Sequence, residues 1–250
     1  MENISLIMET ILVTAAFIAG AVDAIAGGGG LIVMPILLLS GMPVVTALGT
    51  SKFQAMFGSA SATLHYARKG LVDLRTQWKA ALLCAISSFI GAKLVAYLPK
   101  ELLSVALPMI LILVALFFAL APRLSDEDKT ARMEPIVYAM AIAPLIAFYD
   151  GIFGPGAGTF YMLGFVLLAG YGMTRATAHT KLLNLSSNIG ALIAFMLIGA
   201  VNYKLGLMMG VAQFAGARLG AGLAIKGGAK LIRPLLVVTS IGLAVKLLLG

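Results

Sequence analysis

The sequence predicts an all-α integral membrane protein built from two inverted-topology repeats of about five helical segments each. The first observation is composition: 61% of the 250 residues are hydrophobic and 11% are charged, whereas a soluble domain carries about 25% charged residues. The second is that the apolar residues form long blocks, enough for roughly eight full spans, or ten if some are short. The third is that the second half of the chain repeats the motifs of the first half in the same order.

The first half is predicted to hold five helical segments. Four consecutive glycines, Gly27–Gly30, separate the first two segments, and the near-continuous apolar run Ile110–Ala121 belongs to the fifth. Glycine disfavours helix by about 1 kcal/mol per residue relative to alanine. The predicted ranges are 4–25, 30–40, 44–67, 76–97 and 101–121.

A polar stretch follows at 122–133, and its charged core Asp126–Lys129 marks a cytoplasmic linker between a first repeat (1–121) and a second repeat (134–250). The second repeat contains the break Gly154–Gly158, which includes a proline, and the apolar run Leu235–Leu249. Its predicted segments are 134–152, 158–170, 173–198, 203–225 and 230–249.

The repeat is visible as matched motifs with nearly constant spacing. The offset is 127 residues at Asp23 and Asp150 and 129 residues afterwards. An odd number of segments in each half makes the second half enter from the opposite side, and this holds equally if the first two segments form a re-entrant hairpin. The further matches are Gly27-Gly-Gly29 with Gly154-Pro-Gly156, Ser51-Lys52 with Thr180-Lys181, Gly70-Leu-Val-Asp73 with Gly199-Ala-Val-Asn202, and Gly91-Ala92 with Gly220-Ala221.

The formal net charge of +8 is attributed to basic loops on the cytoplasmic side of a membrane. The odd number of segments in each half puts the basic loops on one side of the membrane. If that side is the cytoplasm, both termini lie outside it. One face would carry Arg68, Lys69, Arg75, Lys79, Arg123, Lys129, Arg132, Arg175, Lys226, Lys230 and Arg233, and the other mainly Lys100, Lys204 and Lys246.

The two glycine-rich breaks are candidate anion sites. Irregular backbone inside a membrane must be buried in protein or line a wet cavity, and the helix that follows each break presents free N–H groups and a positive dipole end. Paired breaks at corresponding positions point to a transport site. Close helix packing through small residues is the alternative. The candidate backbone contacts are Gly28, Gly29, Gly30, Gly156, Ala157 and Gly158.

Matched charges accompany the breaks. Lys52 and Lys181 lie near the starts of the third and eighth segments, where they could contact an anion, snorkel to the interface or pair with an acid. Asp23 and Asp150 are candidates for proton coupling, for a structural pair with lysine, or for capping the broken helix. Neutral candidates near the lysines are Ser51, Gln54, His179, Thr180, Asn184 and Asn188.

The sequence lacks the motifs that several other classes of function require. The sequence has no nucleic-acid module, no GxxxxGK[ST] loop for an ATPase, no Ser-His-Asp or HExxH pattern and no His/Cys cluster for a metal. We therefore expect neither an enzyme nor a cofactor. Cys84 is the one thiol, and a sulfur relay through it is left as a competing hypothesis.

The stretch from Ala19 to Pro35, followed by Ala47-Leu-Gly-Thr-Ser-Lys52, resembles the TauE/SafE family of sulfite and organosulfonate exporters. The resemblance continues through Asp150–Thr159 and His179–Asn184. It implies a multi-pass carrier of the bacterial inner membrane that moves sulfite, sulfoacetate or a related sulfonate. Pro155 and Ala157 break the likeness between the two halves.

We therefore expect a secondary carrier that binds one small anion near the midplane, between the repeats, and exports it by alternating access. The expected partners are the anion, the bilayer and a coupling proton or cation. An anion channel, or a carrier that imports another small oxyanion or carboxylate, would use the same features.

Overall fold

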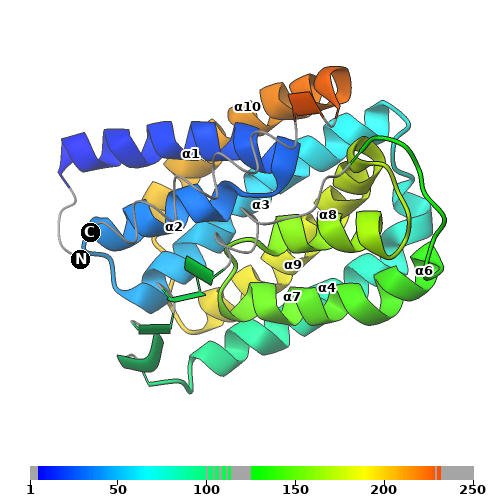
Figure 1. Ribbon diagram of the computed structural model, residues 1–250. Coiled ribbons are helices and arrows are strands. Elements are labelled where there is room, and N and C mark those ends of the chain that lie inside the picture. Colours follow the sequence, from blue (N-terminus) through cyan, green and yellow to red (C-terminus); the bar gives the residue numbers. More distant parts are fainter. Residues whose placement is uncertain are drawn as a thin grey trace.

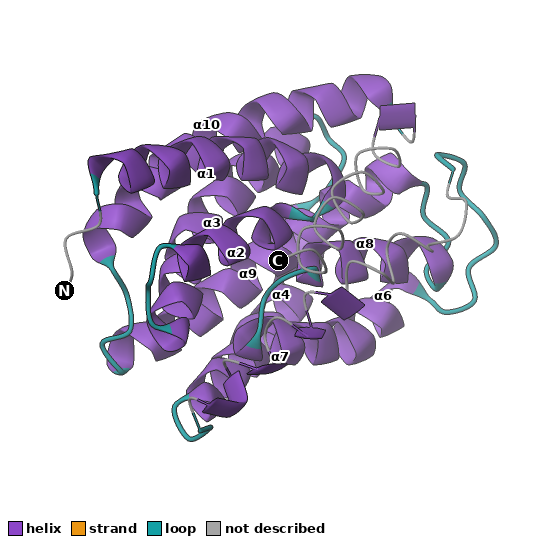
Figure 2. Cartoon of the chain, turned by 60° about the vertical axis from the view of Figure 1, so that its left-hand side comes forward, coloured by secondary structure: helices purple, strands orange, loops and turns teal. Residues whose placement is uncertain are grey.

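The computed structural model describes residues 5–99, 101–103, 105–106, 109–110, 112–113, 125–228 and 230–231. It shows a bundle of long helices whose axes are roughly aligned (Figure 1). Turning the molecule by 60° shows the same all-helical architecture from another side (Figure 2). The first-half helices are α1 (Leu6–Ala26), α2 (Gly29–Leu39), α3 (Val44–Arg68) and α4 (Leu74–Val95). The second-half elements are α6 (Pro135–Val137), the π-helix η1 (Tyr138–Ile142), α7 (Ala143–Ile152), α8 (Ala157–Leu167), α9 (Met173–Leu197) and α10 (Tyr203–Gly227).

The all-helical prediction is confirmed, and the observed helices follow the predicted segments closely. Within the described ranges, five helices are long and apolar enough to cross a membrane: α1, α4, the continuous stretch Pro135–Ile152, α9 and α10. The predicted segments 101–121 and 230–249 lie almost wholly outside the described residues, and the linker is described only from residue 125.

Helices α2 and α8 have 11 residues each. At 1.5 Å per residue such a helix is about 16 Å long, roughly half of the 30 Å hydrocarbon core. Neither helix can cross the membrane alone. In Figure 1 the α1–α2 hairpin and the α7–α8 hairpin enter the bundle from opposite ends, and their tips meet in its interior.

Helices of one half pack mainly on helices of the other. Helix α10 packs on α1 and α3, α4 packs on α7 and α9, and α3 contacts α9 where the two groups join. The repeat makes α1 equivalent to α7 and α4 equivalent to α10. The packing of α1 on α10 therefore corresponds to the packing of α7 on α4. The inverted relation of the complete halves and the domain boundaries stay predictions.

Matched capping residues start α4 and α10. The Asp73 carboxylate accepts the backbone N–H of Arg75 at 2.9 Å, and the Asn202 side chain accepts that of Leu205 at 3.1 Å. Side-chain acceptors at this position satisfy N–H groups that have no partner within the helix. The predicted alignment of these two tetrapeptides is therefore reflected in the same local structure.

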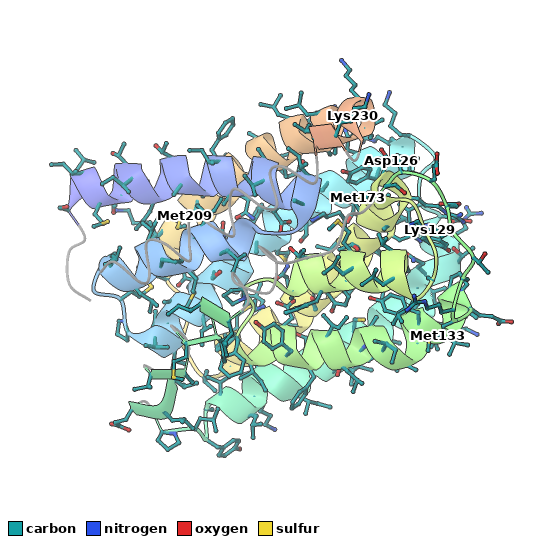
Figure 3. The ribbon with its side chains drawn as sticks, in the orientation of Figure 1. Asp126, Lys129, Met133, Met173, Met209 and Lys230 are labelled. Carbon is teal, nitrogen blue, oxygen red and sulfur yellow. The ribbon has the colours of Figure 1, made fainter. Side chains whose placement is uncertain are left out.

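Large apolar side chains cover the outside of the bundle, as expected for a surface that faces lipid. Exposed examples are Ile11, Ile18, Leu82, Ile86, Ile90, Leu145, Leu219 and Leu223. Charged residues gather at one end, where Figure 3 shows Asp126, Lys129 and Lys230.

At that end the described part of the linker is tied to the start of α9. The Gly172 N–H donates to the Asp128 carboxylate at 2.6 Å, and Arg175 pairs with the same carboxylate at 2.9 Å. The Gly172 hydrogen bond is the largest cause that lowers the pKa of Asp128 below its ordinary value of 3.8, with a smaller contribution from Arg175. Asp126 accepts the N–H of Thr174 at 3.0 Å.

Candidate functional site

The two glycine-rich breaks touch each other inside the bundle. Gly27 ends α1 with φ +82°, and a Cβ placed on it would lie 2.5 Å from the carbonyl carbon of Gly158. Gly154 and Gly156 have φ of +93° and +83°, in the left-handed region that favours glycine. Only a residue without a side chain permits both this conformation and this approach, so the breaks join the tips of the two hairpins.

A side-chain hydrogen bond joins the two tips, and two more fix backbone carbonyl groups close to them. The Thr159 hydroxyl, at the start of α8, donates to the carbonyl of Ala26 at the end of α1, at 3.0 Å. The Tyr66 hydroxyl donates to the carbonyl of Ala24 at 2.8 Å, and the Tyr149 hydroxyl donates to that of Pro155 at 2.7 Å. The bonds to Ala26 and Ala24 satisfy carbonyl groups that the end of α1 leaves without partners, and the bond to Pro155 holds a carbonyl of the loop between α7 and α8.

Two buried ion pairs cross between the halves. Lys52 on α3 pairs with Asp150 on α7 at 2.5 Å, and Lys181 on α9 pairs with Asp23 on α1 at 3.2 Å. Lys181 also donates to the backbone carbonyl of Asp23, and the Ser187 hydroxyl donates to Asp150. Each half therefore supplies the acid that neutralises the base of the other half.

Asp23 also caps the first short helix, α2. Its carboxylate accepts the backbone N–H of Gly29 at 3.4 Å, at the start of α2. Both structural alternatives for this aspartate, pairing with lysine and capping the broken helix, are thus present at once.

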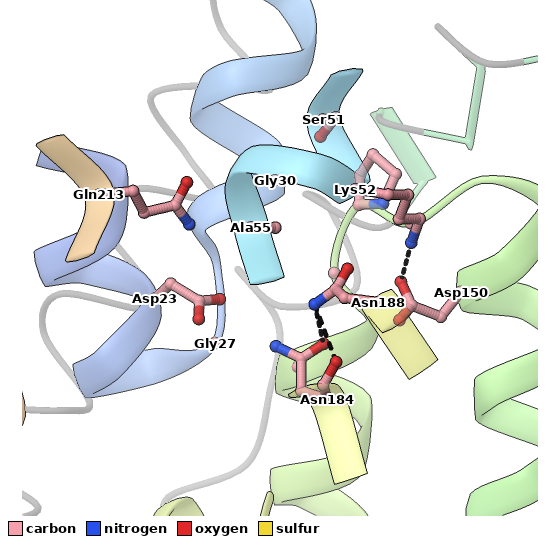
Figure 4. Close-up of a pocket in the computed structure, with 14 residues that line it drawn as sticks. Asp23, Gly27, Gly30, Ser51, Lys52, Ala55, Asp150, Asn184, Asn188 and Gln213 are labelled. Carbon is pink, nitrogen blue, oxygen red and sulfur yellow. Dashed lines mark hydrogen bonds and ion pairs between the residues drawn. The ribbon is translucent and has the colours of Figure 1, made fainter. Parts of the chain in front are cut away.

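A cavity of about 30 Å³ lies where the breaks and α3, α9 and α10 meet. Figure 4 shows Asp23 and Gln213 on one side of it and Lys52 and Asp150 on the other, with Asn184 and Asn188 between them. The Asn188 amide donates to the carbonyl of Asn184 at 2.8 Å. The complete lining is Asp23, Gly27, Gly30, Ser51, Lys52, Ala55, Asp150, Gly154, Pro155, Gly156, Gly158, Asn184, Asn188 and Gln213.

The structure gathers much of the expected site at this cavity. The expected residues that line it are Asp23, Gly30, Ser51, Lys52, Asp150, Gly156, Gly158, Asn184 and Asn188. The expected residues outside its lining are Gly28, Gly29, Gln54, Ala157, His179, Thr180 and Lys181. Lys52 and Lys181, which the repeat makes equivalent, thus differ in position, because only Lys52 faces the cavity.

His179 lies at a second cavity of about 180 Å³, toward the end where α4 and α9 begin. Its Nδ1 is 2.6 Å from the Gln77 amide nitrogen, and its ring lies against the rings of Phe165 and Tyr171. These contacts give His179 a place between helices, and it does not line the central cavity.

Sequence reasoning missed Gln213 on α10. The residue is 2% exposed, and its amide oxygen has no hydrogen-bond partner among the described residues. The sequence does contain a signal for this residue, because Gln213 is a lone amide in an apolar segment, and polar residues within membrane spans commonly mark functional positions. Gly154 was also missing from the expected contacts, although a Cβ there would lie 2.9 Å from the Lys52 ammonium.

Within the described ranges, no group of three or more His, Cys, Asp or Glu side chains could hold a metal ion. The described lining of the central cavity supplies one lysine, two carboxylates, three neutral amides, the Ser51 hydroxyl and backbone N–H groups. This set can recognise a small anion by charge and hydrogen bonding.

Comparison with known proteins gives one family over nearly the whole chain. Residues 12–247 match the family described as "Sulfite exporter TauE/SafE". A Sinorhizobium sp protein named "Probable membrane transporter protein ORF9" is 50% identical over 248 residues, 99% of this chain and 95% of its own length. "Probable membrane transporter protein YfcA" of Escherichia coli (strain K12) is 43% identical over 245 residues, 98% of this chain and 91% of its own length. No solved structure matches the chain.

Proposed function

The chain belongs to the TauE/SafE family of membrane transporters, and on that premise we propose that it carries a small sulfur-containing anion as a secondary transporter. The substrate is sulfite or an organosulfonate such as sulfoacetate, exported across the cytoplasmic membrane by alternating access. Both termini face away from the cytoplasm, and residues 122–133 link the two repeats on the cytoplasmic side.

The observation that carries this proposal is the polar cavity at the meeting point of two helix breaks. The starts of α2 and α8 adjoin it, and helix N-termini favour negative charge. Lys52 adds a full positive charge at the same place, and Asn184 and Asn188 add neutral hydrogen-bonding groups. Together these features suit an oxyanion with several oxygen atoms.

The size of the cavity favours a carrier over an open pore. About 30 Å³ is room for about two water-sized spheres, which is too little for the four or more heavy atoms of an oxyanion. The site must widen before substrate enters. Since the Lys52–Asp150 pair forms part of the wall, separation of this pair would provide both the space and the charge.

Transport assays on the purified chain in liposomes test the proposal. We expect saturable flux and counterflow of sulfite or small sulfonates, whereas an anion channel would give flux without counterflow. A thermal-shift panel of sulfite, sulfate, thiosulfate and sulfonates identifies the preferred anion, because a ligand that binds the folded state raises its stability.

The variant Lys52→Met tests the site itself. We expect it to lose anion binding, while Lys204→Met, which removes an ion-paired lysine whose side chain is 75% exposed, keeps it. Because Lys52→Met leaves Asp150 unpaired, the double variant with Asp150→Asn is the better-folded form of the same test. Anion binding as tight as in the unmodified protein by either Lys52 variant would place the site elsewhere.

A further inference from the structure

The two ion pairs are matched by the repeat but differ in their surroundings. Within the described part of the chain, the Asp23 carboxylate has two partners: Lys181, which is fully buried, and the N–H of Gly29 at the start of α2. Asp150 has Lys52 and the hydroxyl of Ser187. Lys52 faces the cavity and Lys181 does not, so an anion in the cavity competes with Asp150 for its lysine and leaves the Asp23 pair intact.

Removal of Lys52 from Asp150 would leave a carboxylate that is 2% exposed with one hydroxyl donor. A buried charge without a partner is strongly unfavourable, and such groups become neutral instead. The titratable groups that face Asp150 from the elements packed around it are Tyr149, Tyr161 and Cys84, which are uncharged at neutral pH. The Asp23–Lys181 pair lies across the cavity and is already neutral as a unit.

We propose that Asp150 takes up one proton each time an oxyanion binds to Lys52, so that the anion and the proton cross the membrane together. This inference rests on the proposed function. The Asp150 oxygen that bonded to the Lys52 ammonium forms an O–H bond with a proton from the aqueous side to which the cavity is open. Lys52 keeps its charge and pairs with the anion, and departure of the anion reverses both steps.

The charge of the substrate then sets the driving force. A sulfonate monoanion and a proton cross without net charge, so the membrane potential does not act on them. A sulfite dianion and a proton carry one negative charge, and a potential that is negative inside drives such a complex outward. Export of sulfite is therefore compatible with uptake of a proton at Asp150.

The test measures methanesulfonate binding to the purified full chain by titration calorimetry at several pH values. Methanesulfonate remains a monoanion between about pH 6 and about pH 8, so its own ionisation does not contribute. If one proton is taken up per anion, the Kd for methanesulfonate should rise about tenfold for each unit by which the pH is raised. A pH indicator in weakly buffered solution should report one proton taken up per anion bound.

Matched variants assign the proton to its carrier. We expect Asp150→Asn to bind methanesulfonate with a Kd that does not change with pH, and Asp23→Asn to keep the tenfold slope. If a variant fails to fold, the pH dependence of Kd and the proton uptake of the wild-type protein still test the inference. A wild-type Kd that is constant with pH, with no proton uptake, overturns this inference and leaves the proposed function standing. Failure of every anion in the panel to bind at any pH overturns the proposed function instead.

Discussion

Gly27→Ala tests the contact between the two helix breaks, and Gly41→Ala provides a matched control. The two glycines have nearly the same φ, +82° and +81°, but a Cβ at Gly41 meets no atom within 4 Å. Alanine in this left-handed conformation costs about 1–2 kcal/mol at either position. This conformational cost therefore cancels when the two variants are compared.

At Gly27 the added methyl group would also lie 2.5 Å from the carbonyl carbon of Gly158 and 2.6 Å from the nitrogen of Thr159. Both are backbone atoms, which cannot rotate away as a side chain can. Relief requires the hairpin tips to part by about 1 Å, and such overpacking typically costs about 1–3 kcal/mol.

Thermal unfolding in detergent measures the difference. At roughly 2–4 °C per kcal/mol for a chain of this size, Gly27→Ala should melt several degrees below Gly41→Ala. It should also bind anions more weakly, because parting of the tips moves the N-terminal ends of α2 and α8 away from each other and from a shared anion. Equal melting temperatures for the two variants would show that the backbones of the breaks do not touch.

Three further predictions concern other parts of the molecule. Lys181→Met should destabilise the protein by about 3–5 kcal/mol, because it leaves Asp23 as a buried unpaired carboxylate, and adding Asp23→Asn should recover much of this loss in thermal unfolding. Asp128→Asn should lower the melting temperature at neutral pH; this difference should vanish as the pH falls through the lowered pKa of Asp128, below 3.8, because protonation weakens the bond from Gly172. Cys84, with 0% exposure, should resist thiol reagents in the folded protein, and Cys84→Ala should keep its transport rate in liposomes.

The helices were largely predictable because their signals are local. Apolar runs give the elements, and glycine, proline and charge interrupt them. The segment predicted at 44–67 is observed as α3 (Val44–Arg68), and the one at 203–225 as α10. Helix α4 begins at Leu74, two residues before the predicted start at residue 76, because the Asp73 side chain accepts the N–H of Arg75 and caps the helix there.

The candidate site was predictable in kind but not in detail. The matched motifs bring Lys52, Lys181 and their aspartates to the same interior region, as residues shared by two repeats would be. The repeat could not separate the roles of the two lysines, because equivalent sequence positions differ only through packing between distant helices. The position of His179 beside Gln77 depends on a contact across 102 residues, which spacing along one helix does not reveal.

The crossed ion pairs also constrain how the protein is made. Lys52 precedes Asp150 by 98 residues, and Asp23 precedes Lys181 by 158. At about 5–20 residues per second of synthesis, the first member of each pair waits roughly 5–30 s for its partner to emerge from the ribosome. During insertion the early charges must remain hydrated at the translocon or at the lipid headgroups. Burial of these charges is therefore a late step of biogenesis, and it requires the second half of the chain to be in place.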